Sequence, residues 1–437
     1  MITTAISSSL AREAVLYTLP LYEMARMRAA NCPRRDALGQ FAGTTPESTL
    51  RWINHFVHTR QLLGPQHRQV VSPNNDTLYS NAWIDLSQGP LRLTVPASGD
   101  RYYVLGLLDF YTNPFGYIGT RTTGNAAGTY LLHGTNWKGV APAGVTPVAC
   151  PTDAVWLMGR IMIAGVHDLP GAHAFQDAFK LARPDGSNAH RPFDVGMQPN
   201  EHAGDPRRYV DVVARALREN PPPAAQAAMV TRFAAAGIGA DANAAQLGVA
   251  QLTTLRTALA SALEETAAPR PSALGGGWFL PVEVQDSFGD DYFARAQVAR
   301  NYIGALGVKE AMYIMADCDS SGAPLDGTHA YALRFPPGRL PQVGAFWSVT
   351  LYDKADCMLV DNELNRHSLG DRSPALRYDA DGGLRVFFSA QAPRDRENHG
   401  NWLPAPRAPF YLVLRLYMPK EAHLDKSFTY PSINLIS

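Results

Sequence analysis

The chain contains 437 residues, of which 46% are hydrophobic and 18% are charged, a composition that excludes wholesale disorder and favours large buried cores. Its 39 basic and 39 acidic residues give a formal net charge of zero, which removes the main electrostatic reason to expect nucleic acid or an anionic membrane as a partner. The 36 glycines and 33 prolines indicate many turns, as in β-rich folds.

The N-terminal stretch predicts a helix from about Leu10 to Ala30, with a kink or a break at Pro20. Arg12 and Glu13 interrupt the apolar pattern early, so the stretch does not resemble a secretory signal peptide. No apolar run approaches the ~18 residues that a membrane span needs. We therefore expect a cytoplasmic protein with no membrane partner.

A second helix is predicted near residues 49–63, because Trp52, Phe56 and Val57 would share one of its faces. The sequence changes character over residues 76–165. Short runs rich in β-branched and aromatic residues are separated there by Gly, Pro and Asn, a pattern that predicts β-strands.

Residues 173–266 return to helical spacing, most clearly in a leucine stripe formed by Leu252, Leu255, Leu259 and Leu263. The segment "PSALGGGWFLP" marks a linker back toward a sheet, and a further short helix is predicted over 291–305. From residue 312 to the end the strand texture returns.

Two of these late strands, "AFWSVTLYD" and "FYLVLRLYMP", alternate between an apolar face and an aromatic, polar face. We expect the apolar faces to lie in a core. The aromatic faces, with Phe346 and Tyr352 on one strand and Tyr411 and Tyr417 on the other, are candidates for the interface of a homo-oligomer.

The two β-rich regions echo each other, which predicts an internal duplication and two similar sandwiches. In each region one strand ends at an aspartate, Asp109 or Asp353, and an Asn-Trp turn precedes a last strand that carries Arg160 or Arg415. We expect each arginine to pair with a carboxylate and the turn tryptophans to plug the ends of the sandwiches.

Longer segments carry a family resemblance. "PNNDTLYSNAWIDLSQGPLRLTVP" and "YTNPFGYIGTRTTGNAAGTYLLHGTNWKG" resemble the bacterial family called domain of unknown function 1254. "PLDGTHAYALRFPPGRLPQVGAFWSVTLYD" and "NWLPAPRAPFYLVLRLYMP" resemble its usual C-terminal partner, domain of unknown function 1214. The resemblance implies two jelly-roll-type β-sandwich domains joined by helices, often in oligomers, and it brings no established reaction or catalytic residues.

The predicted fold class is therefore mainly β with helices (α+β), with two jelly-roll-like antiparallel β-sandwich domains joined by a helical segment. The predicted boundaries are N-terminal helices in 1–65, a first β-sandwich in 66–172, a helical connector in 173–310 and a second β-sandwich in 311–437.

The first candidate site is "SPNNDTLYSNAWID", where Asn74 and Asn75 stand beside Asp76 and Tyr79 at the entry to the first strand. A carboxylate beside a phenol can orient or deprotonate a bound hydroxyl, so Asp76 and Tyr79 are proposed as catalytic and the asparagines as substrate-binding. An Asx-type turn that satisfies its own backbone is the alternative.

The second candidate is "LDFYTNPFGYIGTR", which leaves a strand with several polar side chains. Asp109 and Arg121 are proposed as catalytic, with Arg121 able to clamp a carboxylate or phosphate, and Tyr111 and Asn113 as substrate-binding. The alternative is a structural Asp109–Arg121 pair.

The third candidate is the stretch from Tyr352 to Asn362 and Arg366, whose side chains are proposed to bind substrate together with Trp402. Within it His367 is the first choice for an acid–base histidine, although an exposed loop histidine without a role is the alternative.

No metal site or cofactor is predicted. Glu397 and His399 would be divalent-metal ligands only if they occupied a strand and a third ligand joined them. No nucleotide-binding or serine-hydrolase motif is present. The four widely spaced cysteines are typical of free thiols in a reduced cytosol, with a Cys318–Cys357 bridge left open.

Three functions fit these features. A cofactor-independent or metal-assisted enzyme of the hydrolase, lyase or isomerase type would act on a small polar organic molecule. A non-catalytic protein would bind a carbohydrate or another small ligand with the same rim. A structural subunit of an oligomer would need only the aromatic sheet faces. The sequence favours the enzyme.

Overall fold

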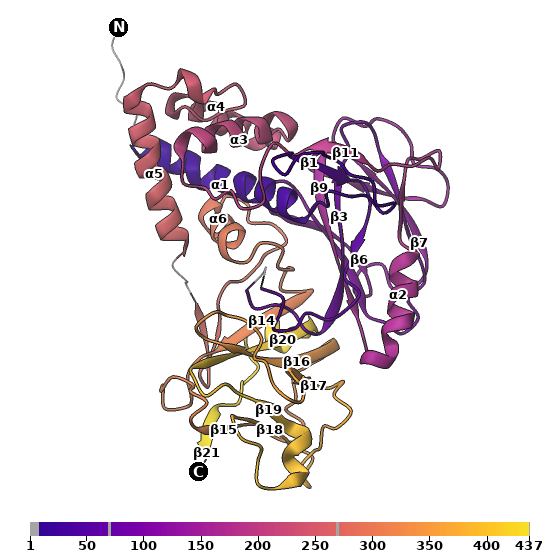
Figure 1. The fold of residues 1–437 in the computed structure, drawn as a ribbon, viewed down its shortest axis with the longest axis vertical. Helices are drawn as coiled ribbons and strands as arrows, with labels where there is room; N and C mark the ends of the chain where they lie inside the picture. Colours follow the sequence, from indigo (N-terminus) through magenta and orange to yellow (C-terminus); the bar gives the residue numbers. More distant parts are fainter. Residues whose placement is uncertain (1–7, 69–70, 268–270, 437) are drawn as a thin grey trace.

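The computed structural model describes residues 8–68, 71–267 and 271–436. It is a mixed α+β protein with several antiparallel sheets, in which a layer of helices lies against the upper part of one β-rich half and a second β-rich half lies below (Figure 1). All four cysteines are free, so no Cys318–Cys357 bridge forms. None of the described helices is both long and apolar enough to cross a membrane.

Apart from the short α7 near the C-terminus, the described helices form near the N-terminus and in the middle of the chain, as the apolar spacing predicted. They are α1 (Ser8–Asn31), α2 (Leu169–Asp177), α3 (Pro206–Glu219), α4 (Ala224–Arg232), α5 (Val249–Ala267), α6 (Tyr292–Asn301) and the short α7 (Glu421–Leu424). Helix α1 continues through Pro20 as one element and lies at the centre of the layer, in contact with α3, α5 and α6.

The first β-rich half, residues 77–162, contains β3 (Thr77–Asp85), β4 (Leu91–Val95), β5 (Tyr103–Leu108), β6 (Pro114–Gly119), β7 (Gly128–His133), β8 (Thr146–Ala149) and β9 (Ala154–Met162). They form two sheets with the orders β2-β3-β9-β5-β6 and β10-β4-β7-β8. The added strands are β2 (Val57–His58) and β10 (Lys180–Ala182). Apolar side chains from both sheets share one core.

The second β-rich half, residues 311–419, contains β14 (Ala311–Ala316), β15 (Ala330–Phe335), β16 (Val343–Asp353), β17 (Ser368–Gly370), β18 (Leu384–Ser389), β19 (Trp402–Pro404) and β20 (Phe410–Pro419). Its sheets have the orders β12-β13-β14-β20-β16-β17 and β19-β18-β15-β21. The added strands are β12 (Ser272–Gly275), β13 (Trp278–Leu280) and β21 (Ile433–Ile436).

The two halves repeat one topology strand by strand. The order β3-β9-β5-β6 in the first half corresponds to β14-β20-β16-β17 in the second, and β4-β7-β8 corresponds to β15-β18-β19. The β7–β8 and β18–β19 pairs are parallel, whereas the other named strand pairs are antiparallel. The sequence echo therefore has a structural counterpart, and Arg160 and Arg415 lie on the corresponding central strands β9 and β20.

The register confirms this correspondence residue by residue. In the first half Arg160 is paired with Tyr79 on one side and with Val104 on the other. In the second half Arg415 is paired with Tyr313 and with Ser348 in the same way. The two arginines are therefore equivalent positions of two equivalent sheets.

Corresponding edge strands end at corresponding glycines. Gly119 of β6 pairs with Val104, and Gly370 of β17 pairs with Ser348. A Cβ atom at Gly119 would lie 2.4 Å from a backbone oxygen of β5, and one at Gly370 would lie 2.1 Å from a backbone oxygen of β16. Close backbone approach therefore requires glycine at both positions.

The helix predicted near residues 49–63 is wrong. This segment instead contains β1 (Leu50–Ile53) and β2, and β1 pairs with β11 (Arg191–Asp194). Asn54 follows β1 with φ 61°, a left-handed conformation that breaks any helix there. The strand hydrogen bonds come from a partner about 140 residues away in the chain, which local spacing does not reveal.

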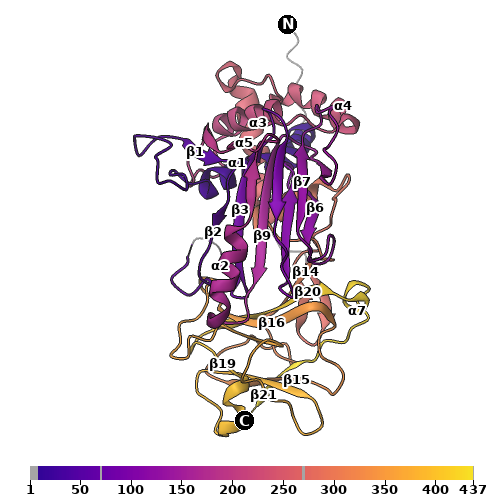
Figure 2. The ribbon, with the colours of Figure 1, turned by 90° about the vertical axis from the view of Figure 1, so that its right-hand side faces the viewer.

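The outer face of the β3-β9-β5 sheet is covered by two different parts of the chain. Toward one end Trp83 and Trp156 stack with ring centroids 5.2 Å apart and pack in one core with α1. Toward the other end Tyr102 packs against Phe346 and Tyr417 of the second half. Figure 2 shows the sheet running from the helices to the second half.

His423 provides a test of the fold through pH. It is 1% exposed, its Nε2 accepts the Gln342 N–H at 2.9 Å, and burial lowers its pKa to about 4. Because the unfolded chain binds this proton near pH 6.5, stability falls as pH drops from about 6.5 through about 4, by up to about 3 kcal/mol. We expect His423→Gln to flatten the dependence of the unfolding free energy on pH over this range, as measured by urea unfolding. His202→Gln, at an exposed site, should leave this dependence unchanged. An unchanged slope in His423→Gln would contradict the prediction.

Candidate functional site

The two halves meet through sheet faces that each carry a buried guanidinium at the centre. Arg160 is 6% exposed and Arg415 is 3% exposed. Removing such a charge from water is costly unless a partner compensates it, so buried arginines normally pair with carboxylates. The identity of their partners therefore decides what this interface can do.

Arg160 has only neutral partners among the described residues. Its Nη1 donates to the Tyr79 hydroxyl at 2.9 Å, and its Nη2 donates to the carbonyl of Gly304 at 3.1 Å. The guanidinium also lies over the Tyr79 ring, 5.1 Å from its centroid. Its Nε is buried and has no hydrogen-bond partner within the described part of the chain.

Arg415 has neutral hydrogen-bond partners as well. Its Nη1 donates to the Thr350 hydroxyl at 2.9 Å, and its Nη2 donates to the Ser72 carbonyl at 3.0 Å and the Tyr352 hydroxyl at 2.7 Å. Its Nε, too, is buried and unpartnered within residues 8–68, 71–267 and 271–436. The prediction that each strand arginine pairs with a carboxylate is wrong, since neither forms a salt bridge with a described residue.

Tyrosine hydroxyls surround the two guanidiniums. Burial raises the pKa of Tyr352 to about 12 and that of Tyr417 well above its usual value, so both phenols are neutral at physiological pH. The Tyr417 hydroxyl accepts from Nδ2 of Asn74 at 2.9 Å. The Tyr313 hydroxyl is buried and has no partner among the described residues. These phenols supply hydrogen bonds but no negative charge.

The nearest carboxylates are engaged in two reciprocal ion pairs across the interface. Asp76, just before β3, accepts from Arg372 at 3.0 Å and from the Ser348 hydroxyl at 2.7 Å. Glu310, just before β14, accepts from Arg121 at 2.5 Å and from Tyr102 at 2.7 Å. Both acids are buried, with exposed fractions of 2% and 1%.

The two ion pairs are formed by residues at equivalent positions of the two halves. Asp76 and Glu310 each stand three residues before the tyrosine paired with the central arginine, and Arg121 and Arg372 each follow an edge glycine by two residues. Each half therefore gives one arginine and receives one carboxylate contact, as in the interface of a symmetric dimer.

We refer to the residues around the two central guanidiniums as the arginine–tyrosine cluster: Asn74, Tyr79, Arg160, Tyr313, Tyr352, Arg415 and Tyr417. Three residues proposed from sequence, Asn74, Tyr79 and Tyr352, belong to it. Asp76 is adjacent, because Asn74 Oδ1 accepts its backbone N–H at 2.6 Å, and it also raises the pKa of Arg415 against the opposing effect of burial. Arg121 lies at the border of the interface, next to Glu310.

The group around Asp109 lies elsewhere. Asp109 follows β5, whose last residue pairs with Trp156, four residues along β9 from Arg160. Its carboxylate accepts the backbone N–H groups of Tyr111 and Asn113, each at 2.9 Å, so it caps a turn. The Tyr111 hydroxyl donates to a helix-layer carbonyl. Neither an Asp109–Arg121 pair nor a shared rim forms.

The third predicted group is satisfied within its own loop. Arg366 donates to the carbonyls of His399 and Trp402, and Nδ2 of Asn362 donates to the Arg366 carbonyl. His367 is 5% exposed and contacts loop oxygens, so the expected exposed histidine is buried. These contacts stabilise the loop that follows β16.

Asn75, Trp402 and the weak metal candidates also have local contacts. Asn75 donates to the Leu63 carbonyl and the Trp402 indole donates to the Ser389 carbonyl. Glu397 and His399 lie in the short 3-10 helix η4 (Arg396–Asn401). They therefore do not occupy the strand that would let both side chains bind one metal ion. Within the described residues no group of three His, Cys, Asp or Glu side chains is placed to hold a metal ion.

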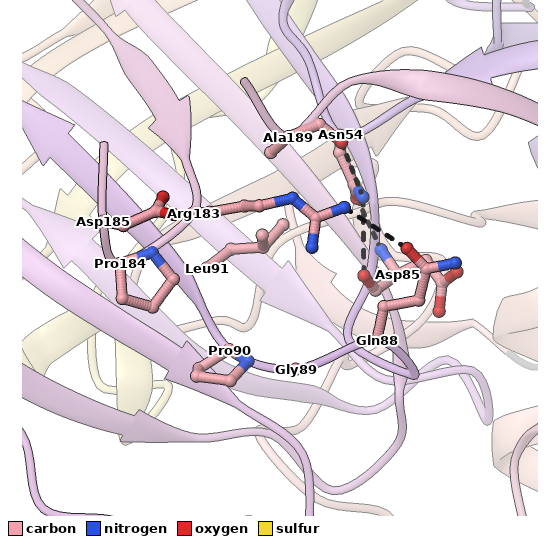
Figure 3. Close-up of a pocket in the computed structure, with 10 residues that line it drawn as sticks. All are labelled: Asn54, Asp85, Gln88, Gly89, Pro90, Leu91, Arg183, Pro184, Asp185 and Ala189. Carbon is pink, nitrogen blue, oxygen red and sulfur yellow. Dashed lines mark hydrogen bonds between the residues drawn. The ribbon is translucent and has the colours of Figure 1, made fainter. Parts of the chain in front are cut away.

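A separate pocket of about 290 Å³ lies on the surface near the end of β3 (Figure 3). Asn54 and Asp85 line one side and the Arg183 side chain extends across it toward Gln88. None of the predicted site residues lines this pocket. The side-chain oxygen of Asn54 accepts a hydrogen bond from the backbone N–H of Asp85, so Asn54 has a structural role.

The aromatic faces proposed for an oligomer interface are covered within the chain itself. Phe346 and Tyr417 are at most 1% exposed and stack with ring centroids 4.1 Å apart, and Tyr352 and Tyr411 stack at 5.2 Å. The segment just before β3 covers part of this surface through the Ser72 hydroxyl, which contacts the Tyr411 hydroxyl at 2.7 Å, and Tyr102 of the sheet covers another part. This surface is therefore the contact between the two halves of one chain.

Comparisons with known proteins agree with the two-part organisation. Residues 53–183 match the family described as "Protein of unknown function (DUF1254)", and residues 310–421 match "Protein of unknown function (DUF1214)". The chain joins these two families in one polypeptide. No curated protein matches it.

The chain is similar to a solved structure, the VPA0106 protein from Vibrio parahaemolyticus, with a TM-score of 0.74 and 24% identity over 98% of this chain and 100% of that one. This likeness shows the fold. A putative uncharacterized protein from Burkholderia cenocepacia matches with a TM-score of 0.43 and 12% identity, over 97% of this chain and 88% of that one.

Sequence reasoning missed several residues of the contact between the DUF1254 and DUF1214 regions. Tyr313, Glu310 and Arg372 were not singled out, although Arg372 ends the polar stretch that contains Asn362 and Arg366. The signal was the echo itself: "IGTR" and "LGDR" occupy corresponding positions and end in Arg121 and Arg372. Extending the alignment of the two regions would have identified Arg372 as the equivalent of Arg121, but not the carboxylates with which the two arginines pair.

The reciprocal pairs predict a stability effect. We expect Arg372→Met to cost about 3–5 kcal/mol of unfolding free energy, because it leaves Asp76 buried without its cation. Arg121→Met should act similarly on Glu310. Adding Asp76→Asn to Arg372→Met should recover part of the loss in urea unfolding.

The matched control is Arg334→Met. Arg334 pairs with Asp379 and Asp381 on an exposed surface, where such pairs contribute at most about 1 kcal/mol. Equal losses in Arg334→Met and Arg372→Met would contradict a special role for the interdomain pairs.

Proposed function

We propose that this protein binds a small organic acid at the arginine–tyrosine cluster and acts on it without a cofactor. The observation that carries the proposal is a pair of buried guanidiniums, Arg160 and Arg415, whose described hydrogen-bond partners are all neutral. A bound anion would compensate both the charge and the unpaired Nε donors.

The surrounding groups favour a carboxylate over a neutral sugar. Arginine presents a planar set of donors that matches a carboxylate in a bidentate way. The neutral phenols of Tyr352 and Tyr417 add hydrogen-bonding capacity without repelling an anion. A sugar would satisfy hydrogen bonds but would leave the buried positive charge uncompensated.

The same groups are suited to reactions in which negative charge develops on oxygen. A guanidinium can hold the substrate carboxylate while a neutral phenol donates to a developing enolate or alkoxide. Tyr313 is the best placed donor, because its hydroxyl has no other described partner. Elimination and isomerisation of a small acid are therefore the proposed reaction classes.

Ligand entry requires movement, because Arg160 and Arg415 are buried in the described conformation. The Ser72 carbonyl contacts Arg415, and the neighbouring Asn74 contacts Tyr417. Displacing this segment, or separating the two halves locally, would expose the cluster. We expect association to be slower than for an open surface site.

Thermal unfolding with a ligand panel tests the proposal. We expect small carboxylates at 100 times their Kd to add about 2.7 kcal/mol of stability and raise Tm by several degrees. Glucose and MgCl₂ at the same ionic strength should have no such effect. Arg160→Gln and Arg415→Gln should each weaken the response, whereas the surface variant Arg334→Gln should keep it in full. An equal response in all variants, or no response to any carboxylate, would sink the proposal.

A further inference from the structure

We infer that the ligand is a dianion with two separated acid groups, a short-chain dicarboxylate, and that each half of the protein holds one of its carboxylates. This inference rests on the proposed function, because it specifies the chemistry of the same cluster. The inference is based on the equivalence of Arg160 and Arg415, because a ligand with a single acid group would bind only one of these two arginines.

The cluster has twofold character. Arg160 and Arg415 occupy the same position on the central strand of equivalent sheets, and each is paired across the sheet with a tyrosine, Tyr79 or Tyr313. Paired positions on neighbouring strands project to the same face, so each guanidinium has a phenol beside it. A twofold site is complementary to a ligand with two like ends.

Side chains from the two halves pack against each other beside the two guanidiniums. Tyr417, from the second half, belongs to one buried cluster with Val104, the residue paired with Arg160 in the first half. Tyr313, which is paired with Arg415, packs against the same cluster. The faces meet directly where Tyr102 and Tyr417 rings lie 5.7 Å apart, so no backbone layer separates them.

Each guanidinium retains a donor for one carboxylate. The Nε atoms of Arg160 and Arg415 are buried and have no hydrogen-bond partner among the described residues. The Tyr313 hydroxyl is likewise buried and has no such partner. The carboxylates of Asp76 and Glu310 are already held by Arg372 and Arg121. A monoanion would bind one central guanidinium and leave the other with neutral hydrogen-bond partners only, which is the costlier arrangement.

The two ends of the site differ in detail. Arg160 contacts Tyr79 and the Gly304 carbonyl, whereas Arg415 contacts Tyr352, Thr350 and the Ser72 carbonyl. The unpartnered Tyr313 hydroxyl comes from the strand next to Arg415. The two carboxylates are therefore bound equivalently but not identically, which allows chemistry at one end only.

Calorimetry on the full chain with matched ligand pairs tests the inference. Malonate, succinate, glutarate and adipate are compared with the monocarboxylates of equal carbon number at constant ionic strength and pH 7. We expect one dicarboxylate length to bind about 10- to 100-fold more tightly than its monocarboxylate, since it gains a second set of charge-assisted hydrogen bonds. Phosphate, a compact dianion, should bind less tightly than that dicarboxylate.

Three variants locate the binding. Arg160→Gln and Arg415→Gln should each reduce dicarboxylate affinity to the monocarboxylate level. Tyr313→Phe removes only a hydroxyl without a described partner, so it should fold normally and still weaken the dicarboxylate by about 5- to 10-fold. This variant keeps the test decisive if an arginine variant fails to fold. Unchanged dicarboxylate affinity in Tyr313→Phe overturns the inference.

The outcomes separate the two proposals. Equal affinity for mono- and dicarboxylates, or tighter binding of phosphate, overturns the dianion inference while the organic-acid or anion site stands. Failure of every carboxylate to bind overturns both. Tight dicarboxylate binding that disappears in Arg160→Gln and in Arg415→Gln supports both.

Discussion

Two buried guanidiniums at the contact between equivalent sheets are the constraint on which the rest of the structure depends. An uncompensated guanidinium in a protein interior costs several kcal/mol, and Arg160 and Arg415 each rely on neutral oxygens in this conformation. Two further arginines, Arg121 and Arg372, pair with the acids that flank them, so four guanidiniums share two carboxylates at the contact. Removing one acid would add to an existing excess of positive charge around the central pair.

The repeated topology explains how one chain builds such a contact. Each half supplies a carboxylate before its first strand and an arginine after its edge glycine, so the Arg372–Asp76 and Arg121–Glu310 pairs form together. The contact has the self-complementary character of a twofold dimer interface within a single polypeptide. The aromatic faces that would suit an oligomer are used for this internal contact, while the helices cover the remaining end of the first sheet (Figure 2).

Much of the fold could be predicted because its signals are local. Alternation in "FYLVLRLYMP" identified both faces of β20, and Leu414 and Arg415 do lie on opposite sides of that strand, one in the core and one at the contact. The helix predicted for residues 49–63 was wrong because the structure of this segment depends on a distant part of the chain. Trp52 and its neighbours have helical spacing, but β1 is extended because residues 191–194 supply its hydrogen bonds.

The sequence by itself determined that residues 76–165 and 312–437 are rich in strands, that helices form in the middle of the chain, and that the two β-rich regions echo each other. It did not determine which polar residues share a site. Asp76 meets Arg372 across 296 residues and Asn74 meets Tyr417 across 343, while Asp109, closer in the chain, caps its own turn. Only the packing of one sheet against its equivalent decided this, because such distant pairing depends on three-dimensional register that no local pattern encodes.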